Sequence, residues 1–402
     1  MFFRENKNKI TVGAIIEVGS GSVAVGIVKS SSTQKNPEII WGYRELASSR
    51  YSLDGFGAAK DILKTIERAV TELGTTGVKS LKEHKSSLRI NEVQVSIAAP
   101  WSYTATSTVN YRKDKEFKVT KSIIEKITTE AAHKINSEVT AQEEILKLGL
   151  EIISQNYHST LLNGYQTIDP VNQVTNLITL NQITSISQKK LVDTLDNELG
   201  KILPKVPTQH FSFMYLFFEV IKYSLTHYNE YCLVDITDNA TEIGVVRNGI
   251  LQYCTHTPVG KNSLIYLLSE RLKIPFEEAA SYVRSTKEAN LWEQLSTSQR
   301  ETVEDILSEY QNELAKLFHE TGDGLTIPRL FFIHSDKNTE LFFNEQIVLA
   351  ANQTTKTKHQ SRSVSTELLS HGNQNEEGGV NLPVSPDTAS LIAALFFHIN
   401  HQ

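Results

Sequence analysis

Two short segments of the chain combine a carboxylate with a polar turn between apolar strands. In the first, Glu17 precedes the turn Gly19-Ser20-Gly21-Ser22, and in the second, Asp235 precedes Thr237-Asp238-Asn239 and Thr241. A turn that contains glycine lets successive backbone N–H groups converge on an anion, because a residue without Cβ adopts positive φ freely. The first segment therefore has the composition of an anion-binding turn, whereas the second turn has no glycine.

The two segments repeat one pattern. The run from Ile16 to Lys29 aligns without gaps on the run from Val234 to Arg247, with acid on acid and glycine on glycine. In each copy an apolar strand reaches the acidic residue, and a second apolar strand returns after the turn. A third strand follows in both halves, over 37–46 and 250–257, and then a helix, over 61–73 and 262–272. The repeat predicts two lobes of one plan, and the alternative is a chance similarity between two buried hairpins.

Size and composition fit two lobes of a folded, soluble protein. The chain has 402 residues, of which 40% are apolar and 21% charged, and its net charge is −6. One core rarely serves so long a chain. Interspersed charges offer no basic surface for nucleic acid, so no nucleic-acid partner is expected. The two cysteines, Cys232 and Cys254, are expected to be buried thiols and not metal ligands, as suits a reducing compartment.

The location of the protein is also an expectation from composition. The N-terminus lacks the apolar stretch of a signal peptide. The most apolar interior stretch, Phe211 to Ile221, is much shorter than the roughly 20 residues that cross a bilayer, and it predicts a buried core helix. We therefore expect a cytoplasmic protein.

Duplicated lobes with such hairpins resemble the actin, Hsp70 and sugar-kinase superfamily. Residues 233–236, 241–249 and 257–260 resemble the second phosphate-loop region of the bacterial cell-division protein FtsA and the pilus-assembly protein PilM. Leu272 to Ala279 is similar to the stretch that follows in those families, and Ile15 to Val23 resembles their first phosphate loop. The resemblance implies an α/β, two-lobed actin/Hsp70-like (ribonuclease H-like) fold with an inserted α+β SHS2-like subdomain in the first lobe.

The element pattern and the resemblance together give expected domain boundaries. The first lobe would comprise 1–88 and 186–226, with the SHS2-like subdomain at 89–185; the second lobe would comprise 227–268 and 328–402, with a helical small subdomain at 269–327. Residues 352–383, rich in Ser, Thr, Gln and Asn, predict a mobile loop. For the inserted segment, an ordinary α+β domain is the alternative.

The resemblance further implies a nucleotide site between the lobes, where backbone amides of both turns hold the phosphates of ATP with Mg²⁺. No residue is nominated as catalytic or as a direct metal ligand. The residues implied as cofactor-binding are Glu17, Gly19, Ser20, Gly21, Ser22, Asp235, Thr237, Asp238, Asn239, Thr241, Gly260 and Ser335.

Three departures from the family pattern favour a degenerate cleft, in which nucleotide binding is weak or lost. Asp238 stands where the family has small residues. If its carboxylate lay about 5 Å from a phosphate, the repulsion between the two charges would cost about 3 kcal/mol at an effective dielectric near 20. That would weaken nucleotide binding by about two orders of magnitude. A Mg²⁺ ion bridging Asp238 and the phosphate would turn this repulsion into attraction. Glu17 replaces the expected Asp, and His334-Ser335 replaces a glycine pair. We expect His334 to be a solvated turn residue, and the alternative is that it faces the cleft.

Two hypotheses about function follow from the resemblance. The first is a cytoplasmic scaffold without catalysis that recruits a membrane protein's cytoplasmic segment or a filament, through the inserted subdomain or a groove beside it. It would serve a cell-division or type IV pilus assembly machine, reach the inner face of the membrane only through partners, and could form homo-oligomers. The second is an active ATPase or small-molecule kinase. Because nothing outside the hairpins nominates a catalytic base, the first is favoured, with at most weak ATPase activity.

Overall fold

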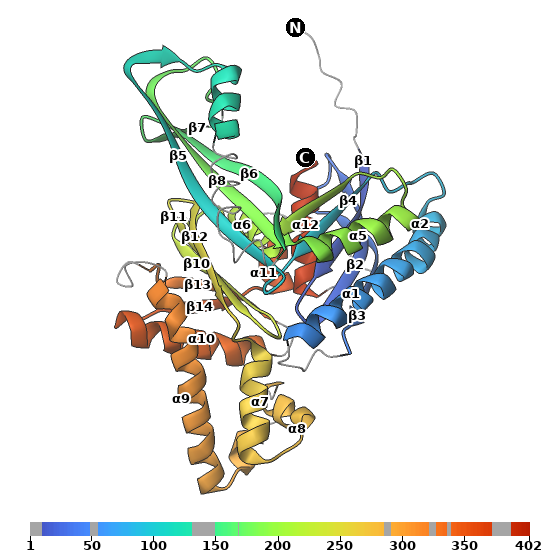
Figure 1. The fold of residues 1–402 in the computed structure, drawn as a ribbon, viewed down its shortest axis with the longest axis vertical. Helices are drawn as coiled ribbons and strands as arrows, with labels where there is room; N and C mark the ends of the chain where they lie inside the picture. The colour runs from blue at the N-terminus through green and yellow to red at the C-terminus, as the bar shows by residue number, and fades with distance from the viewer. Residues whose placement is uncertain are drawn as a thin grey trace.

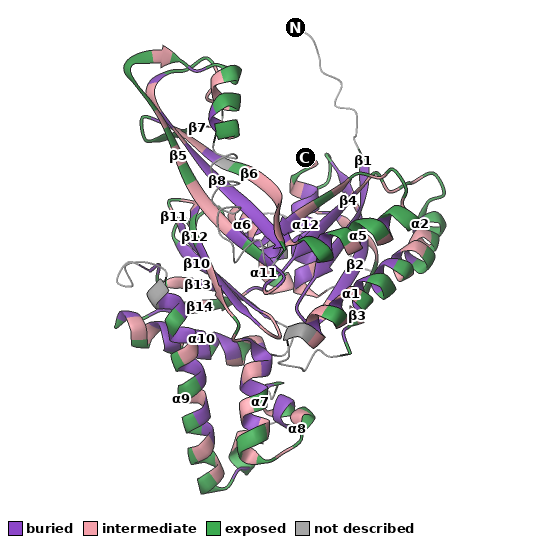
Figure 2. Cartoon of the chain, viewed as in Figure 1, coloured by how far each residue is buried: buried purple, intermediate pink, exposed green. Residues whose placement is uncertain are grey.

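The computed structural model describes residues 10–48, 55–130, 149–167, 169–284, 291–320, 327–335, 339–371 and 387–402. These residues form three β-sheets with helices around them, and the third sheet projects away from the two lobes (Figure 1). Burial follows the sheets, whose central strands are buried while the outer helices expose one side (Figure 2). No helix among the described residues is long and apolar enough to span a membrane.

The first lobe is built on a five-stranded sheet of order β3-β2-β1-β4-β9. Its strands are β1 (Ile10–Val18), β2 (Ser22–Ser31), β3 (Glu38–Leu46), β4 (Glu92–Ile97) and β9 (Thr208–Ser212). Strands β3, β2 and β1 pair antiparallel, whereas β1, β4 and β9 pair parallel. The predicted hairpin at Glu17 is therefore the β1–β2 hairpin at the centre of this sheet.

Helices cover both faces of the first sheet. Alternate residues of β1, such as Val12 and Ile16, pack with α1 (Gly55–Glu72) and α5 (Lys189–Ile202). A short π-helix (Leu73–Gly77) and α2 (Val78–His84) continue α1. The other face packs against α6 (Phe213–Ser224) and α12 (Thr388–Ile399). Most of α6 is buried, which confirms the core helix predicted around Phe211 to Ile221.

The second lobe repeats the plan of the first. Its sheet order is β12-β11-β10-β13-β14, with the same sequence of antiparallel and parallel pairings. The strands are β10 (Tyr231–Ile236), β11 (Thr241–Arg247), β12 (Ile250–Thr257), β13 (Leu330–His334) and β14 (Gln360–Ser363). The internal repeat found in the sequence is thus confirmed as a repeat of sheet topology. Cys232 and Cys254 are buried free thiols in this lobe, as predicted.

The helices between β12 and β13 extend below the sheet of the second lobe (Figure 1). They are α7 (Lys261–Leu272), α8 (Phe276–Arg284), a 3₁₀ turn (Leu291–Gln294) and α9 (Thr297–Glu320); α10 (Glu340–Thr355) and α11 (Thr366–His371) follow β13 in the chain. Residues of α7, α8, α9 and α10 form one apolar core with one face of the sheet. The hairpin signal Asn248-Gly249 is confirmed, because both residues adopt the positive φ that a tight hairpin turn requires, 53° and 69°.

An α+β subdomain is inserted between β4 and α5. Its four-stranded sheet has the order β5-β8-β6-β7, with β5 (Ser102–Lys118), β6 (Leu150–Leu162), β7 (Tyr165–Thr167) and β8 (Val174–Gln188). A helix over 121–130 packs on it through Ile127, against Ile178 and Leu180 of β8. Asn163-Gly164 forms the predicted turn, with φ of 50° and 87°.

Two boundary predictions are wrong, both because pairing partners lie far apart in the chain. Residues 92–97 were placed in the inserted segment, but β4 pairs with β1 and belongs to the first lobe's sheet. The last helix was placed in the second lobe with 328–402, but α12 packs on β1, where Gly13 leaves room for the ring of Phe397.

The loop expected over 352–383 is also wrong in part. Residues up to Thr355 continue α10, β14 pairs in parallel with β13, and α11 follows. Polar residues can form β14 because its pairing uses backbone groups and only one side of the strand faces the protein interior. Residues 372–383 lie outside the described residues.

Candidate functional site

A cavity of about 330 Å³ lies between the two lobes, where the β1–β2 and β10–β11 turns face each other. Ile265 and Val283, from α7 and α8, form an apolar part of its wall. Most of the predicted site residues line the cavity: Glu17, Gly19, Ser20, Gly21, Ser22, Asp235, Thr237, Asp238 and Ser335. The repeat found in the sequence therefore does bring the two acidic turns to one place.

Three predicted residues, Asn239, Thr241 and Gly260, do not line this cavity. The Thr241 hydroxyl donates to the carbonyl of Val259 at 2.7 Å. Gly260 precedes α7 and lies so close to the second turn that a Cβ on it would be 2.5 Å from the backbone N of Ala240. These residues build the second turn and its contact with α7.

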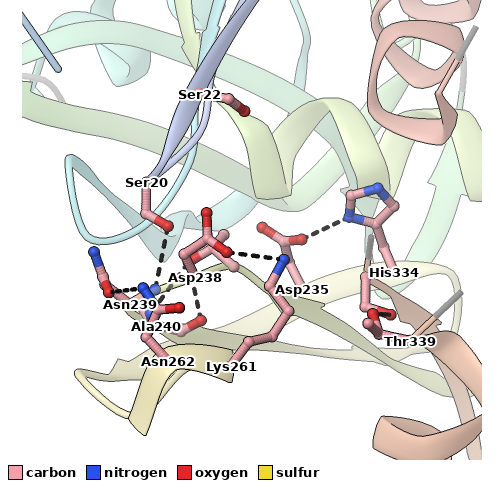
Figure 3. A network of polar contacts seen from close by, with 12 residues as sticks. Ser20, Ser22, Asp235, Asp238, Asn239, Ala240, Lys261, Asn262, His334 and Thr339 are labelled. Atoms are coloured by element: carbon pink, nitrogen blue, oxygen red, sulfur yellow. Dashed lines mark hydrogen bonds and ion pairs between the residues drawn. The ribbon is translucent and has the colours of Figure 1, made fainter. Parts of the chain in front are cut away.

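The two turns contact each other directly. The Ser20 hydroxyl accepts a hydrogen bond from the backbone N–H of Asn239 at 3.2 Å (Figure 3). Behind this contact, the indole of Trp101 donates to the carbonyl of Gly19 at 2.9 Å, and the Thr237 hydroxyl donates to the carbonyl of Ala99 at 3.1 Å. Hydrogen bonds involving side chains thus join the two turns to each other and to residues 99–101.

Backbone amides of the second turn also bond within the turn. The N–H of Thr237 donates to the carbonyl of Ala240 at 2.9 Å, and the N–H of Ala240 donates to the Thr237 hydroxyl at 3.1 Å. The carbonyls of Thr237 and Asp238 accept from the first N–H groups of α7, those of Lys261 and Asn262, at 3.1 and 2.8 Å. Together with the N–H of Asn239, which donates to Ser20, the N–H groups of Thr237 and Ala240 make three amide donors of this turn that already have acceptors in the protein.

The carboxylate of the first turn is paired with an arginine. Arg44 of β3 donates to Glu17 at 2.9 Å, to Asp387 at 2.8 Å and to the Ser22 hydroxyl at 2.6 Å. Burial raises the pKa of Glu17, although Arg44 acts against that rise. Burial also acts to raise the pKa of Asp387, but Arg44 and the N–H of Ser390 outweigh it and hold that pKa at about 2. The pairs join the first turn to the start of α12.

Carboxylates of the second lobe also have basic partners. Asp235 Oδ1 is 2.7 Å from His334 Nδ1, and Asp238 Oδ1 is 3.2 Å from Lys261 Nζ (Figure 3). The prediction that His334 is a solvated turn residue is wrong, because β13 extends to this residue and pairs it with Asp235. The alternative is confirmed, since His334 lines the cavity. Its ring is buried against Phe213 and Phe217.

No family model matches this chain, and no curated protein matches it by sequence. Among solved structures, it is similar to a chain of the PilM-PilN type IV pilus biogenesis complex, with a TM-score of 0.55 and 11% identity over 96% of this chain and 97% of that one. The fold is that of the actin-like ATPases, in its PilM-like form. The protein EutJ from Carboxydothermus hydrogenoformans gives a TM-score of 0.39 at 11% identity, covering 96% of this chain and 89% of EutJ.

The PilM-like fold explains why the two turns meet, but the side chains around them were not all foreseen. Lys261, Arg44 and Asp387 were missed by the sequence reasoning. Lys261 had a signal, since a lysine directly after Gly260 at the start of a predicted helix is placed to reach the turn before it. Arg44 and Asp387 come from β3 and the start of α12, and nothing in their local sequence links them to Glu17.

The predicted repulsion between Asp238 and a phosphate assumed a carboxylate without a counter-charge. Lys261 lies beside Asp238, and its side chain is only 5% exposed, so the assumption is wrong. The electrostatic cost of an anion near this turn is correspondingly smaller.

Proposed function

We propose that this protein is a scaffold of PilM or FtsA type without catalytic activity, and that its inter-lobe cleft does not bind Mg²⁺-ATP. The observation that supports this most directly is the bonding of the second turn, where the N–H groups of Thr237, Asn239 and Ala240 have acceptors within the protein. A phosphate that used these donors would first have to break the bonds, each worth about 1 kcal/mol.

The carboxylates of the cleft support the same proposal. Mg²⁺ binds through oxygen ligands and retained waters, and it commonly uses one or two carboxylates beside substrate phosphates. Here Glu17 is paired with Arg44, and Asp238 with Lys261, so a cation near either carboxylate would meet a positive side chain. The positive side chains beside Glu17 and Asp238 therefore disfavour Mg²⁺ at these two carboxylates, and no reaction step is assigned to the cleft.

We expect no saturable heat when the protein is titrated with ATP in excess Mg²⁺ by calorimetry, and no ligand-dependent rise in its melting temperature. A ligand that binds only the folded state stabilises by about 2.7 kcal/mol at 100 times its Kd, so even modest binding would be visible in the melting curve. An actin-like ATPase of known affinity serves as positive control. Saturable binding with phosphate release would overturn the proposal and establish the alternative, an active ATPase or small-molecule kinase.

The partner that we propose is the cytoplasmic segment of a membrane protein, which would hold the chain at the inner face of the membrane. The similarity to a chain of a PilM-PilN complex supports a protein partner, and it favours a pilus machine over a division machine. We further propose that the inserted α+β subdomain is the SHS2-type module of these families and that the segment docks beside it.

A second cavity, of about 200 Å³, offers the place for this docking. It lies where the first lobe, the inserted subdomain and the C-terminal helix meet, and its wall includes Gln94, Asn156, Gln209, Tyr215 and His401. Amide side chains beside an aromatic ring suit a peptide, whose backbone needs both donors and acceptors. We call it the subdomain groove.

Replacing Asn156 by Arg is expected to reduce capture of the membrane partner about tenfold, because the longer charged side chain would occupy the subdomain groove. Quantitative mass spectrometry of proteins retained from detergent-solubilised membranes measures this. Asn110→Arg is the matched control, since Asn110 is an exposed residue of β5 that does not line the groove. If the Asn156→Arg variant retained every membrane protein that the wild type retains, docking in this groove would be wrong.

A further inference from the structure

The second lobe has a groove that is separate from the inter-lobe cavity and from the subdomain groove. It lies between α10 and β14 and has a volume of about 520 Å³. Leu341, Asn344, Glu345 and Leu349 of α10 form one wall, and His359 and Ser361 lie on the other. We call it the α10–β14 groove.

Strand β14 is at the end of its sheet. It pairs with β13 on one side, and among the described residues no strand pairs with its other side. Such an edge presents backbone N–H and C=O groups that another extended segment can pair with. Ser361 and Ser363 line the groove, while Gln360 and Arg362 are exposed. A segment lying along β14 would therefore have both an edge to pair with and a groove for its side chains.

Two buried acceptors in the groove wall lack donors. His359 is 3% exposed, and its Nδ1 lies 3.0 Å from the Asn352 oxygen that also accepts from the His359 backbone N–H. Since that oxygen can only accept, Nδ1 carries the proton and Nε2 is an acceptor, which has no hydrogen-bond partner. Asn344 is 8% exposed and donates to the Ser363 hydroxyl, but its Oδ1 also has no partner.

A buried polar group without a hydrogen-bond partner destabilises the protein, so these two acceptors favour an occupant that supplies N–H groups. Burial lowers the pKa of His359, which keeps its ring neutral and Nε2 able to accept. Both the amide N–H groups of a peptide and basic side chains are donors of the right kind.

Charge and apolar surface narrow the class of occupant. Helix α10 carries Glu340 and Glu345 but no lysine or arginine, and the groove lining contains one carboxylate and no basic residue other than neutral His359. Leu341 is 75% exposed and Leu349 is 38% exposed on the same wall. Successive side chains of a strand point to opposite faces, so an occupant whose groove-facing side chains, at every second position, are apolar and basic would match this surface.

We propose that the α10–β14 groove binds an extended, basic segment of a partner protein, which adds to β14 as a further strand. In such strand addition the main-chain bonds supply affinity and the groove selects the side chains. The inference does not rest on the scaffold proposal or on the state of the cleft. Together with the subdomain groove, however, it would let one molecule hold two different partner segments at once.

The test uses the full chain and a fluorescein-labelled peptide of about eight residues, the length of an ordinary strand. Val and Lys take turns at every second position, which faces the groove, and Thr fills the positions between them. Fluorescence anisotropy is expected to show binding at least tenfold tighter than for the same peptide with Glu in place of Lys. Methylating alternate backbone nitrogens of the Val-Lys peptide is expected to abolish binding, because it removes the N–H groups that pair with β14. The proposal would be overturned if the methylated peptide bound equally well. It would also be overturned if binding of the Val-Lys peptide did not saturate by about 1 mM protein, which corresponds to a binding free energy near −4 kcal/mol.

Variants of the protein provide the second half of the test. Glu345→Lys is expected to weaken binding of the Val-Lys peptide at least tenfold, since it replaces an exposed carboxylate of the groove by a like charge. Glu304→Lys makes the same charge change at an exposed position of α9 outside the groove and is expected to leave binding unchanged. Equal losses in the two variants would show attraction to net charge alone and would contradict the proposal.

Discussion

The variant Glu242→Gln is expected to be about 4 kcal/mol more stable than the wild type at pH 8, and only about 1 kcal/mol more stable at pH 5. Glu242 is 1% exposed, on β11 opposite Asp235, and neither of its carboxyl oxygens has a hydrogen-bond partner. Burial raises the pKa of Glu242 to about 8, and the nearby charge of Asp235 adds to the rise. The nearby Thr104 hydroxyl, which does not reach hydrogen-bond geometry with the carboxyl, acts in the opposite direction and lowers the pKa.

The direction of this pH dependence follows from the number of protons that Glu242 binds in the folded and in the unfolded state. In the unfolded chain the carboxyl has a pKa near 4.5, and in the folded protein near 8, so between these values the folded state holds a proton that the unfolded state has lost. Stability therefore falls as pH rises through this window, by up to about 1.4 kcal/mol per pH unit. Below it both states are protonated, and the group contributes no pH dependence. Glutamine removes the titration while keeping the size and shape of the protonated side chain.

Urea unfolding of both proteins at several pH values between 5 and 8 measures the difference. The wild type is expected to lose stability relative to the variant across this range, and the control Glu301→Gln, at an exposed position of α9, is expected to follow the wild type. A variant whose stability changed with pH in parallel with the wild type would contradict the raised pKa.

The features that could be predicted from the sequence are those that depend on neighbouring residues. The β1–β2 and β10–β11 hairpins, the turns at Asn163 and Asn248, and the core helix α6 follow from alternation, turn residues and apolar runs. Because the two hairpins are copies, their alignment also predicted that two lobes share one sheet topology. The meeting of most predicted site residues in one cavity was a consequence of that symmetry.

The features that could not be predicted depend on pairs of residues far apart in the chain. The strand at 92–97 looks the same whether it pairs with β1 or belongs to the inserted sheet, since alternation does not name a partner. The apolar α12 could have packed on either lobe, and it was the small Gly13 on β1 that left room for Phe397. Arg44 and Asp387 reach Glu17 only because of these packings.

The second turn of the cleft illustrates the same limit. Its lack of glycine was visible in the sequence, but the weak nucleotide binding predicted from this turn was argued from the charge of Asp238. In the structure the charge of Asp238 is paired with Lys261. The backbone N–H groups of Asn239 and Ala240 instead donate hydrogen bonds to the hydroxyls of Ser20 and Thr237. A sequence shows which residues a turn contains, whereas the acceptors of its N–H groups depend on the opposite lobe.

Gly260→Ala is expected to lower the free energy of unfolding by about 3 kcal/mol, at the upper end of the losses caused by overpacking. The added Cβ would lie 2.5 Å from the N of Ala240, 2.6 Å from the carbonyl oxygen of Asp238 and 2.7 Å from the N of Asn239. All three are backbone atoms, which cannot rotate away as a side chain can. Because Gly260 has φ −120° and ψ −162°, which alanine also adopts, the loss would be steric and not conformational.

Relief of the clash requires α7 and the second turn to separate. That movement would lengthen the hydrogen bonds from the first N–H groups of α7 to the carbonyls of Thr237 and Asp238, and with them the Lys261 to Asp238 ion pair. Urea unfolding measures the loss, with Gly200→Ala as control: a Cβ on Gly200 of α5 meets nothing within 4 Å, and alanine there should stabilise the helix by about 0.5–1 kcal/mol. If both substitutions stabilised the protein, α7 would not be packed against the turn as described, and the Lys261 to Asp238 pairing that balances the charge of the cleft would have to be abandoned.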